Sequence, residues 1–265
     1  MRILVALAIE SEFAPWRRLD GIDLERVKRA NTASRAGIVA TASIRNTQVD
    51  FLLTGMGAPN ARRAIREALA SGTYQMCIAA GLSGGLVPTI ASEEIIAPES
   101  IRNGSEEKAV RSDANLLLLA ETSGARRVKT LLTADHIVYS AAEKSALAQR
   151  ADIVDMESFE FTAAAAEAQV PFVAIRAISD DAAAELPSGL ETLVDEFGHA
   201  KAGAALRMVA TRPWTVRSLM RLGRTSKDAS QKLAYFVRNY IEQISLQEQA
   251  FTTQDQQDLQ RSGAR

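Results

Sequence analysis

Three acidic residues each follow an apolar run that has the composition of a buried β-strand. They are Glu12 after "RILVALA", Glu157 after "IVDM" and Asp180 after "FVAIRAIS". In open α/β sheets, ligands bind in the crevice beyond the carboxyl ends of the strands. We therefore expect the three carboxyl groups to meet at one site, although they lie far apart in the sequence.

Such a set of acids suits the cleavage of the bond between a sugar and a nucleobase. This reaction passes through an oxocarbenium-like sugar and expels a poor leaving group. One carboxyl group can protonate the base, a second can bind the ribose hydroxyls, and a third can activate water. Met156 would offer an apolar wall beside Glu157, whereas Asp155 lies one residue too early to share the site.

A structural role is the alternative for each acid. Glu12 and Glu157 could be first-turn acids that complement a helix dipole, and Asp180 or its neighbour Asp181 could cap the next segment. Arg176 lies inside an apolar run, where an unpaired charge is costly. We expect it to pair with a site carboxylate, and a structural ion pair elsewhere stays open. His136 could contact a ligand or serve the structure.

Strand-like and helix-like runs alternate along the chain, which indicates a layered α/β fold. The predicted strands cover residues 2–8, 36–43, 49–55, 75–81, 93–98, 127–133, 153–156 and 172–179. The predicted helices cover 59–71, 140–150 and 158–169, with Pro59 in the first turn of one and Ser140 as N-cap of another. "GMGAPN" (55–60) lacks the third glycine of a dinucleotide fingerprint, and we interpret it as a strand-to-helix turn.

Composition excludes several classes of protein. The 265 residues carry a net charge of -1, so a basic surface for nucleic acid is not expected. One cysteine, Cys77, cannot form an internal disulfide and lies in an apolar run, which favours a reducing cytoplasm. With two histidines and one cysteine, we expect no metal site. The apolar start of the chain is too short for a signal segment and is predicted to be a strand.

Four motifs together resemble the superfamily of nucleoside phosphorylases and methylthioadenosine/S-adenosylhomocysteine nucleosidases. They are "AIESEF", "AAGLSGGL", "IVDMES" and "VPFVAIRAISDDA", and the likeness covers residues 1–210. The later segments "LPSGLETLVDEFG" and "TRPWTVRSLMRLGR" resemble the hopanoid-associated phosphorylase branch. The resemblance implies a catalytic domain over 1–210, folded as a three-layer α/β/α sandwich with a mixed central sheet.

The resemblance also implies roles for individual residues. Glu157 would bind the ribose hydroxyls with Met156 against the sugar, Asp180 would protonate the purine at N7, and Glu12 would position the attacking water. Further substrate contacts would come from Ile137 and Val138 along the base, from Gly81 and Ser83 near the nucleophile, and from Arg176. The chain departs from the family at Leu82, where a serine is usual, and at Ala79, where hexameric bacterial phosphorylases have an arginine. Ile137 replaces the base-stacking aromatic residue of the nucleosidases.

These features predict an enzyme that hydrolyses the N-glycosidic bond of a purine nucleoside, such as a 5′-modified adenosine. Two alternatives stay open: a phosphorylase, with inorganic phosphate as co-substrate and a hopanoid-linked adenosine among its substrates, and a nucleoside-binding module without catalysis. We expect no metal or organic cofactor, no nucleic-acid partner, a homo-oligomer and a cytoplasmic location.

The last segment, 211–265, is predicted to be a basic helical extension that ends in a fraying polar tail. Between Arg212 and Arg238, seven cations stand against Asp228 alone: Arg212, Arg217, Arg221, Arg224, Lys227, Lys232 and Arg238. Pro213 and Gly223 are expected to interrupt the helix. Apolar residues such as Trp214 and Met220 are interleaved with the cations, so the extension could contact an anionic membrane surface. Packing on the core or on another subunit, with solvated cations, is the alternative.

Overall fold

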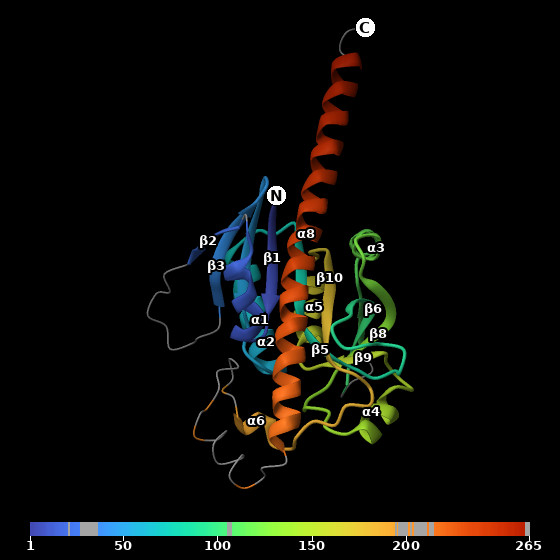
Figure 1. The fold of residues 1–265 in the computed structure, drawn as a ribbon. Coiled ribbons are helices and arrows are strands. Elements are labelled where there is room, and N and C mark those ends of the chain that lie inside the picture. Colours follow the sequence, from blue (N-terminus) through green and yellow to red (C-terminus); the bar gives the residue numbers. More distant parts are fainter. Residues whose placement is uncertain are drawn as a thin grey trace.

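The computed structural model describes residues 1–20, 22–26, 37–104, 108–193, 195, 201, 203, 211 and 215–262, and gives only the backbone of 23, 191 and 251–262. In this part of the chain, ten strands form one mixed sheet (Figure 1). They are β1 Arg2–Leu7, β2 Asp23–Arg26, β3 Gly37–Ile44, β4 Thr47–Leu53, β5 Met76–Gly85, β6 Ile95–Asn103, β7 Ala109–Arg111, β8 Arg126–Thr133, β9 Ile153–Asp155 and β10 Phe172–Asp180.

The sheet is centred on β5, which pairs in parallel with β1 on one side and with β10 on the other. The end of β5 also pairs antiparallel with β9. From β10 the pairing continues through β6 and β8 to β9, so these strands close a ring with β5. The mixed sheet expected from the resemblance is confirmed. The ring closure was not predicted from the strand pattern.

Helices cover both faces of the sheet. They are α1 Glu10–Phe13, the 3₁₀-helix η1 Ala14–Arg18, α2 Ala58–Ser71, α3 Ala114–Thr122, α4 Ala141–Leu147, α5 Ser158–Glu167, α6 Leu190–Leu193 and α8 Val216–Ser262. Successive side chains of β1 alternate between the two faces, as strand geometry requires. Ile3 and Val5 pack in one apolar cluster with α8, whereas Leu4 packs with α2 and α5 in another. The predicted three-layer fold is confirmed.

The termini of several helices agree with the sequence analysis. Ser140 caps α4 by accepting a hydrogen bond from the Glu143 backbone, and Pro59 lies in the first turn of α2. Cys77 is a buried free thiol. Helix α3 was not predicted, although Asp113 caps it through two backbone N–H groups. Its four consecutive leucines hide the period of an amphipathic helix, so the run gave no helical signal.

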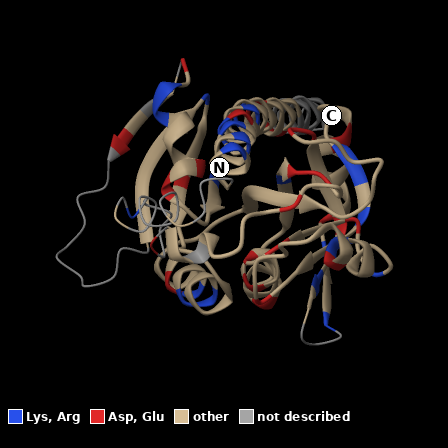
Figure 2. Cartoon of the chain, turned by 60° about the horizontal axis from the view of Figure 1, so that its bottom comes forward, with Lys and Arg blue, Asp and Glu red and all other residues tan. Residues whose placement is uncertain are grey.

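The predicted C-terminal helix is confirmed, and it contributes to the core. Ala229, Leu233, Val237 and Tyr240 pack in the same apolar cluster as β1, and the Tyr240 hydroxyl donates to the Leu116 carbonyl at 2.7 Å. Lys and Arg recur along this helix (Figure 2), and those at 217, 221, 224, 227 and 232 are exposed. Among the described residues, no helix is long and apolar enough to cross a membrane.

One expectation about this segment was wrong, because Gly223 does not interrupt the helix, whereas the fraying of the polar tail stays a prediction. Helix α8 continues through Gly223 and extends to Ser262 beyond the body of the molecule (Figure 1). An exposed glycine costs a helix only about 1 kcal/mol, and the packing of the following turns outweighs that cost. Pro213 and Trp214 lie outside the described residues. The domain boundary at residue 211 and the membrane contact stay predictions.

Candidate active site

A cavity of about 240 Å³ lies where β1 and β10 end and where β9 crosses the end of β5. Its lining brings together the three predicted acids, Glu12, Glu157 and Asp180. Other predicted site residues also line it, namely Met156, Ile137, Val138 and Ser83. Segments separated by more than 150 residues therefore meet at one site, because their strands end or cross at the same edge of the sheet.

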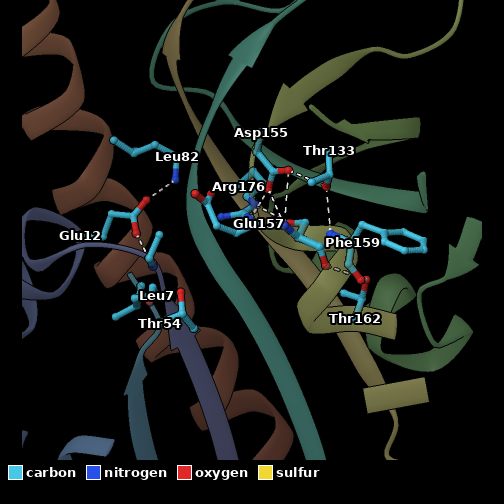
Figure 3. Close-up of polar contacts among 12 residues, drawn as sticks. Leu7, Glu12, Thr54, Leu82, Thr133, Asp155, Glu157, Phe159, Thr162 and Arg176 are labelled. Carbon is cyan, nitrogen blue, oxygen red and sulfur yellow. Dashed lines mark hydrogen bonds and ion pairs between the residues drawn. The ribbon is translucent and has the colours of Figure 1, made fainter. Parts of the chain in front are cut away.

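Glu12 is fixed by backbone N–H groups. Its Oε2 accepts hydrogen bonds from Ala8 at 2.8 Å and Ile9 at 3.2 Å, and its Oε1 accepts one from Leu82 at 2.8 Å (Figure 3). Burial raises the pKa of Glu12, and this effect is opposed by the charge of Arg176 and by the three N–H groups. A carboxylate held in this way has a fixed orientation, and its raised pKa suits it to accept a proton.

Glu157 is held by the turn between β4 and α2. The Gly57 N–H donates to its Oε1 at 2.7 Å, and Gly57 has a φ of 85°, which glycine adopts without strain. The interpretation of "GMGAPN" as a strand-to-helix turn is confirmed, but its contact with Glu157 was missed. Burial raises the pKa of Glu157 to about 8, with further contributions from the charges of Asp155 and Glu12.

Arg176 and Asp155 form a buried ion pair beside the cavity. The Arg176 Nη2 pairs with Asp155 and with the Ser158 hydroxyl, while Asp155 also accepts a hydrogen bond from the Thr133 hydroxyl at 2.8 Å (Figure 3). Asp155 lines the cavity, whereas Arg176 is not among the lining residues. The positive charge of the guanidinium opposes the effect of burial on Glu12 and Glu157, although the pKa of each glutamate stays above its ordinary value. Its predicted contact with substrate stays a prediction.

Gly81 makes room for this arrangement. A Cβ atom at position 81 would lie 1.9 Å from Nη1 of Arg176 and 3.0 Å from Oε1 of Glu12. Both atoms belong to side chains that are held by their own partners, so neither can easily move away. The structure thus requires glycine at 81 for steric reasons, and the predicted approach of a nucleophile to this residue is untested.

Asp180 accepts hydrogen bonds on both carboxylate oxygens. The Ser179 hydroxyl donates to Oδ1 at 2.5 Å, and Nζ of Lys144 donates to Oδ2 at 2.5 Å. Lys144 also donates to the Asp181 carbonyl at 2.7 Å and is fully buried. Lys144 was not predicted as a site residue, because "AEKSA" has the composition of a solvated helix. Lys144 lies three and four residues before Leu147 and Ala148, which pack inward. This helical spacing places Lys144 on the buried face of α4 and was the signal that could have identified it.

The loop before α4 borders the other side of the cavity. It carries Ile137 and Val138, and it is tied to α4 through His136, whose ring nitrogens lie 2.6 Å from Asp135 and 2.7 Å from Glu143. These carboxylates, Glu143 first, raise the pKa of His136. The helix therefore holds both the loop, through Glu143, and Asp180, through Lys144.

Ser83 presents a hydroxyl that the rest of the described chain does not satisfy. Its Oγ is buried without a hydrogen-bond partner among the described residues, although Ser83 lines the cavity. Buried hydroxyl groups normally have a partner, so a ligand or water in the cavity is the natural one. In the described part of the chain, no group of three or more His, Cys, Asp or Glu residues could hold a metal ion.

Comparisons with known proteins agree with this fold. The family model of the phosphorylase superfamily matches residues 2–211. A mutant of the futalosine hydrolase of Helicobacter pylori has a TM-score of 0.69 at 15% identity, over 92% of this chain and 99% of that one. The 5′-methylthioadenosine/S-adenosyl homocysteine nucleosidase of the same organism gives 0.69 at 16% identity, over 92% and 98%. The corresponding nucleosidase of Neisseria meningitidis, in complex with methylthio-immucillin-A, gives 0.67 at 17%, over 91% and 99%.

At these identities the solved structures show a shared fold, whereas the family model identifies the superfamily from the sequence itself. The model covers the segments that contribute Glu12, Glu157 and Asp180 to the cavity. The resemblance found in the motifs is therefore confirmed: the chain belongs to the phosphorylase superfamily.

Proposed function

We propose that this protein is a purine nucleosidase that hydrolyses the N-glycosidic bond of a 5′-modified adenosine. The observation that carries the proposal is the convergence of Glu12, Glu157 and Asp180 on one cavity. In this assignment Asp180 faces the purine, Glu157 binds the ribose hydroxyls, and Glu12 orients the attacking water. Met156 packs against the sugar, and Ile137 and Val138 lie along the base.

The charges around the sugar position favour an oxocarbenium-like transition state. The charges of Asp155 and Glu12 both raise the pKa of Glu157, so three carboxyl groups lie close enough to interact. Negative charge that is concentrated at one end of a cavity favours a cation that develops there. The energetic cost of holding these carboxylates together is thus recovered in the transition state, where the sugar becomes positive.

The same charges favour water over phosphate as the nucleophile. Phosphate is an anion and requires donors or cations. The described lining contains no arginine, and its lysine, Lys144, is engaged with Asp180. Ser83 offers a hydroxyl, but a single hydroxyl beside two glutamates does not compensate a phosphate dianion. Phosphorolysis, including that of a hopanoid-linked adenosine, is accordingly the second candidate.

The products of the reaction distinguish these candidates. The protein should be incubated with adenosine, 5′-methylthioadenosine and S-adenosylhomocysteine, each with and without phosphate. We expect free adenine and a free sugar at a rate that does not depend on phosphate. Formation of a sugar 1-phosphate with a strict need for phosphate would make the protein a phosphorylase. Binding of the nucleosides without release of base would make it a non-catalytic binding module.

The 5′ substituent should extend toward the first half of α8. Leu222 and Ser226 of this helix line the cavity together with Ala8 and Ile9. Their mixture of apolar and small polar groups accepts a modified 5′ carbon more readily than a charged phosphate. The predicted homo-oligomer and the cytoplasmic location stay predictions.

Replacing Glu157 with glutamine tests the ribose-binding role. Contacts to the sugar hydroxyls strengthen as the sugar gains positive charge, so kcat/KM for a ribonucleoside should fall by roughly 10²-fold or more. The corresponding 2′-deoxynucleoside lacks one of these contacts and should lose much less. Kinetic constants for the pair of substrates provide the measurement, and the exposed Glu167→Gln on α5 provides a control. Equal losses for both substrates would contradict the role.

A further inference from the structure

Lys144 is a buried cation that none of the roles above uses. Its side chain is 1% exposed, and it reaches the cavity from the middle turn of α4. Burying an ammonium group is costly unless its donors are satisfied. Two acceptors are provided by Oδ2 of Asp180 and by the carbonyl of Asp181. The short α4 helix thus places a positive charge directly on the carboxylate that faces the purine.

This contact determines where the proton of the site resides. Both oxygens of Asp180 accept hydrogen bonds, one from Ser179 and one from Lys144. Both oxygens are thus occupied by donors, so a proton carried by Asp180 would have no acceptor among these two partners. Protonation of a leaving purine nevertheless requires a proton at this position. In the arrangement seen here, the donors in contact with Asp180 are the Lys144 amine and the Ser179 hydroxyl.

We propose that Lys144 supplies, through Asp180, the proton that the departing purine takes. The acid of the site is then the Lys144–Asp180 pair, with Lys144 as a positioning and proton-supplying residue and Asp180 in contact with the base. The proposal rests on the cleavage reaction proposed above. It adds a residue to the machinery and explains where Asp180, whose two oxygens both accept hydrogen bonds, obtains the proton that it passes on.

The reaction balances as follows. As the bond between C1′ and N9 breaks, its electron pair passes to the purine, and N7 takes a proton from Asp180. This proton is the one that Lys144 has first given to Oδ2 of Asp180, so Asp180 returns to a carboxylate and Lys144 is left as a neutral amine. Water adds to the sugar and loses a proton to Glu12. Glu12 then releases this proton to solvent, and Lys144 takes one from solvent.

Other titratable groups surround the pair. Glu12, Asp155 and Glu157 line the same cavity, and His136 and Glu143 lie on the loop and helix beside Lys144. Asp181 adjoins Asp180 and lies 4.0 Å from Arg221 of α8. These groups stay in place when Lys144 alone is replaced. A change in the pH profile that is specific to a Lys144 variant therefore reports on the pair.

The pH dependence of kcat in Lys144→Met and Lys144→Arg tests the proposal. An ammonium group holds its proton to higher pH than a carboxyl group does. Lys144→Met should therefore be slower than wild type by about 10²–10³-fold at pH 8, and by much less at pH 5, where acid from solvent is far more abundant and can replace the proton of Lys144. Lys144→Arg keeps the charge but does not release its proton, so it should stay slow at pH 8. Lys232→Met is the control, since Lys232 pairs with Glu93 on the surface.

Two results would overturn the proposal. Recovery of most of the wild-type rate in Lys144→Arg would mean that the cation only orients Asp180. A uniform loss in Lys144→Met, with an unshifted pH profile, would mean that Lys144 serves the structure alone. Lys144→Gln replaces the methionine variant if that variant does not fold.

Thermal unfolding tests the pair without any substrate. Lys144→Met leaves a buried carboxylate unpaired, so its Tm should fall by several degrees, and adding Asp180→Asn in the same chain should restore part of the loss. Additive losses in Tm would contradict the pairing. If the wild-type protein releases no base from any nucleoside, the proposed function fails, and the Tm cycle still decides whether Lys144 and Asp180 are coupled.

Discussion

Asp180→Asn should lower kcat by about 10²–10⁴-fold while the protein stays folded, because an amide cannot deliver a proton to the departing base. The asparagine oxygen can still accept the hydrogen bond from Lys144, so the cation keeps a partner. Substrate should still bind, since the ribose contacts of Glu157 are unchanged. Steady-state and single-turnover rates with an adenosine derivative, together with thermal unfolding, provide the measurement.

The neighbouring residue offers a matched control. The Asp181 side chain accepts a hydrogen bond from the Ala183 backbone at 3.1 Å and does not contact Lys144, which binds the carbonyl of Asp181 instead. Asp181→Asn should therefore keep most of the activity. If Asp181→Asn were the inactive variant and Asp180→Asn the active one, the assignment of the acid would move by one residue.

The two replacements also separate the acid from its proton supply. Once Asp180 is asparagine, no proton can pass from Lys144 to the base, so Lys144→Met should cost little more in kcat. Residues that act as a unit show such non-additive losses. The fourfold comparison of wild type, both single variants and the double variant therefore tests the pair by rate, as the Tm cycle tests it by stability.

Much of the fold could be predicted because it depends on local pattern. The runs that became β1, β4 and β10 are rich in apolar residues and lack a clean alternation, which is typical of strands that are covered on both faces. Strand β5 was expected to end at Gly81, where glycines begin, but it continues to Gly85. Pairing with β9 and β10 extends it there. Tertiary contacts of this kind are not visible in the local sequence.

From the residues alone, the candidate site was predictable where a carboxylate follows a strand, and the family resemblance added Ile137, Val138 and Ser83. Glu12, Glu157 and Asp180 could be found because their strands set their positions. Lys144 could not be assigned, because a lysine on a helix is usually solvated and its partner lies 36 residues away. The partner of Arg176 could not be assigned from the sequence either. Asp155, which was expected to lie one residue too early for the site, forms the ion pair with Arg176. The charge of Arg176 in turn acts on the pKa of both Glu12 and Glu157.

Glu12→Gln should remove the base that activates water. We expect kcat to fall by about 10²–10⁴-fold while KM changes little, because Glu12 acts on the nucleophile and Glu157 holds the sugar. Glutamine can keep only part of the contacts to Ala8, Ile9 and Leu82. Its NH₂ group would face a backbone N–H group, and two donors cannot form a hydrogen bond with each other. Thermal unfolding must therefore accompany the kinetics. Glu10→Gln is the control, because Glu10 lies on the same helix and pairs with Arg17.

The pH dependence of kcat/KM also tests the role of Glu12. Glu12 must be ionised to accept a proton, and its pKa is raised by burial. In the wild-type protein kcat/KM should thus decline as the pH falls through a value above the ordinary range of a glutamate. Glu157, with a pKa of about 8 before substrate binds, adds a second decline in the same direction. In Glu12→Gln the decline due to Glu12 should be missing and that of Glu157 should remain. If phosphate were the nucleophile, it would need no base. A Glu12→Gln variant with a nearly normal rate that depends on phosphate would therefore refute hydrolysis. Glu12 would then be a structural acid.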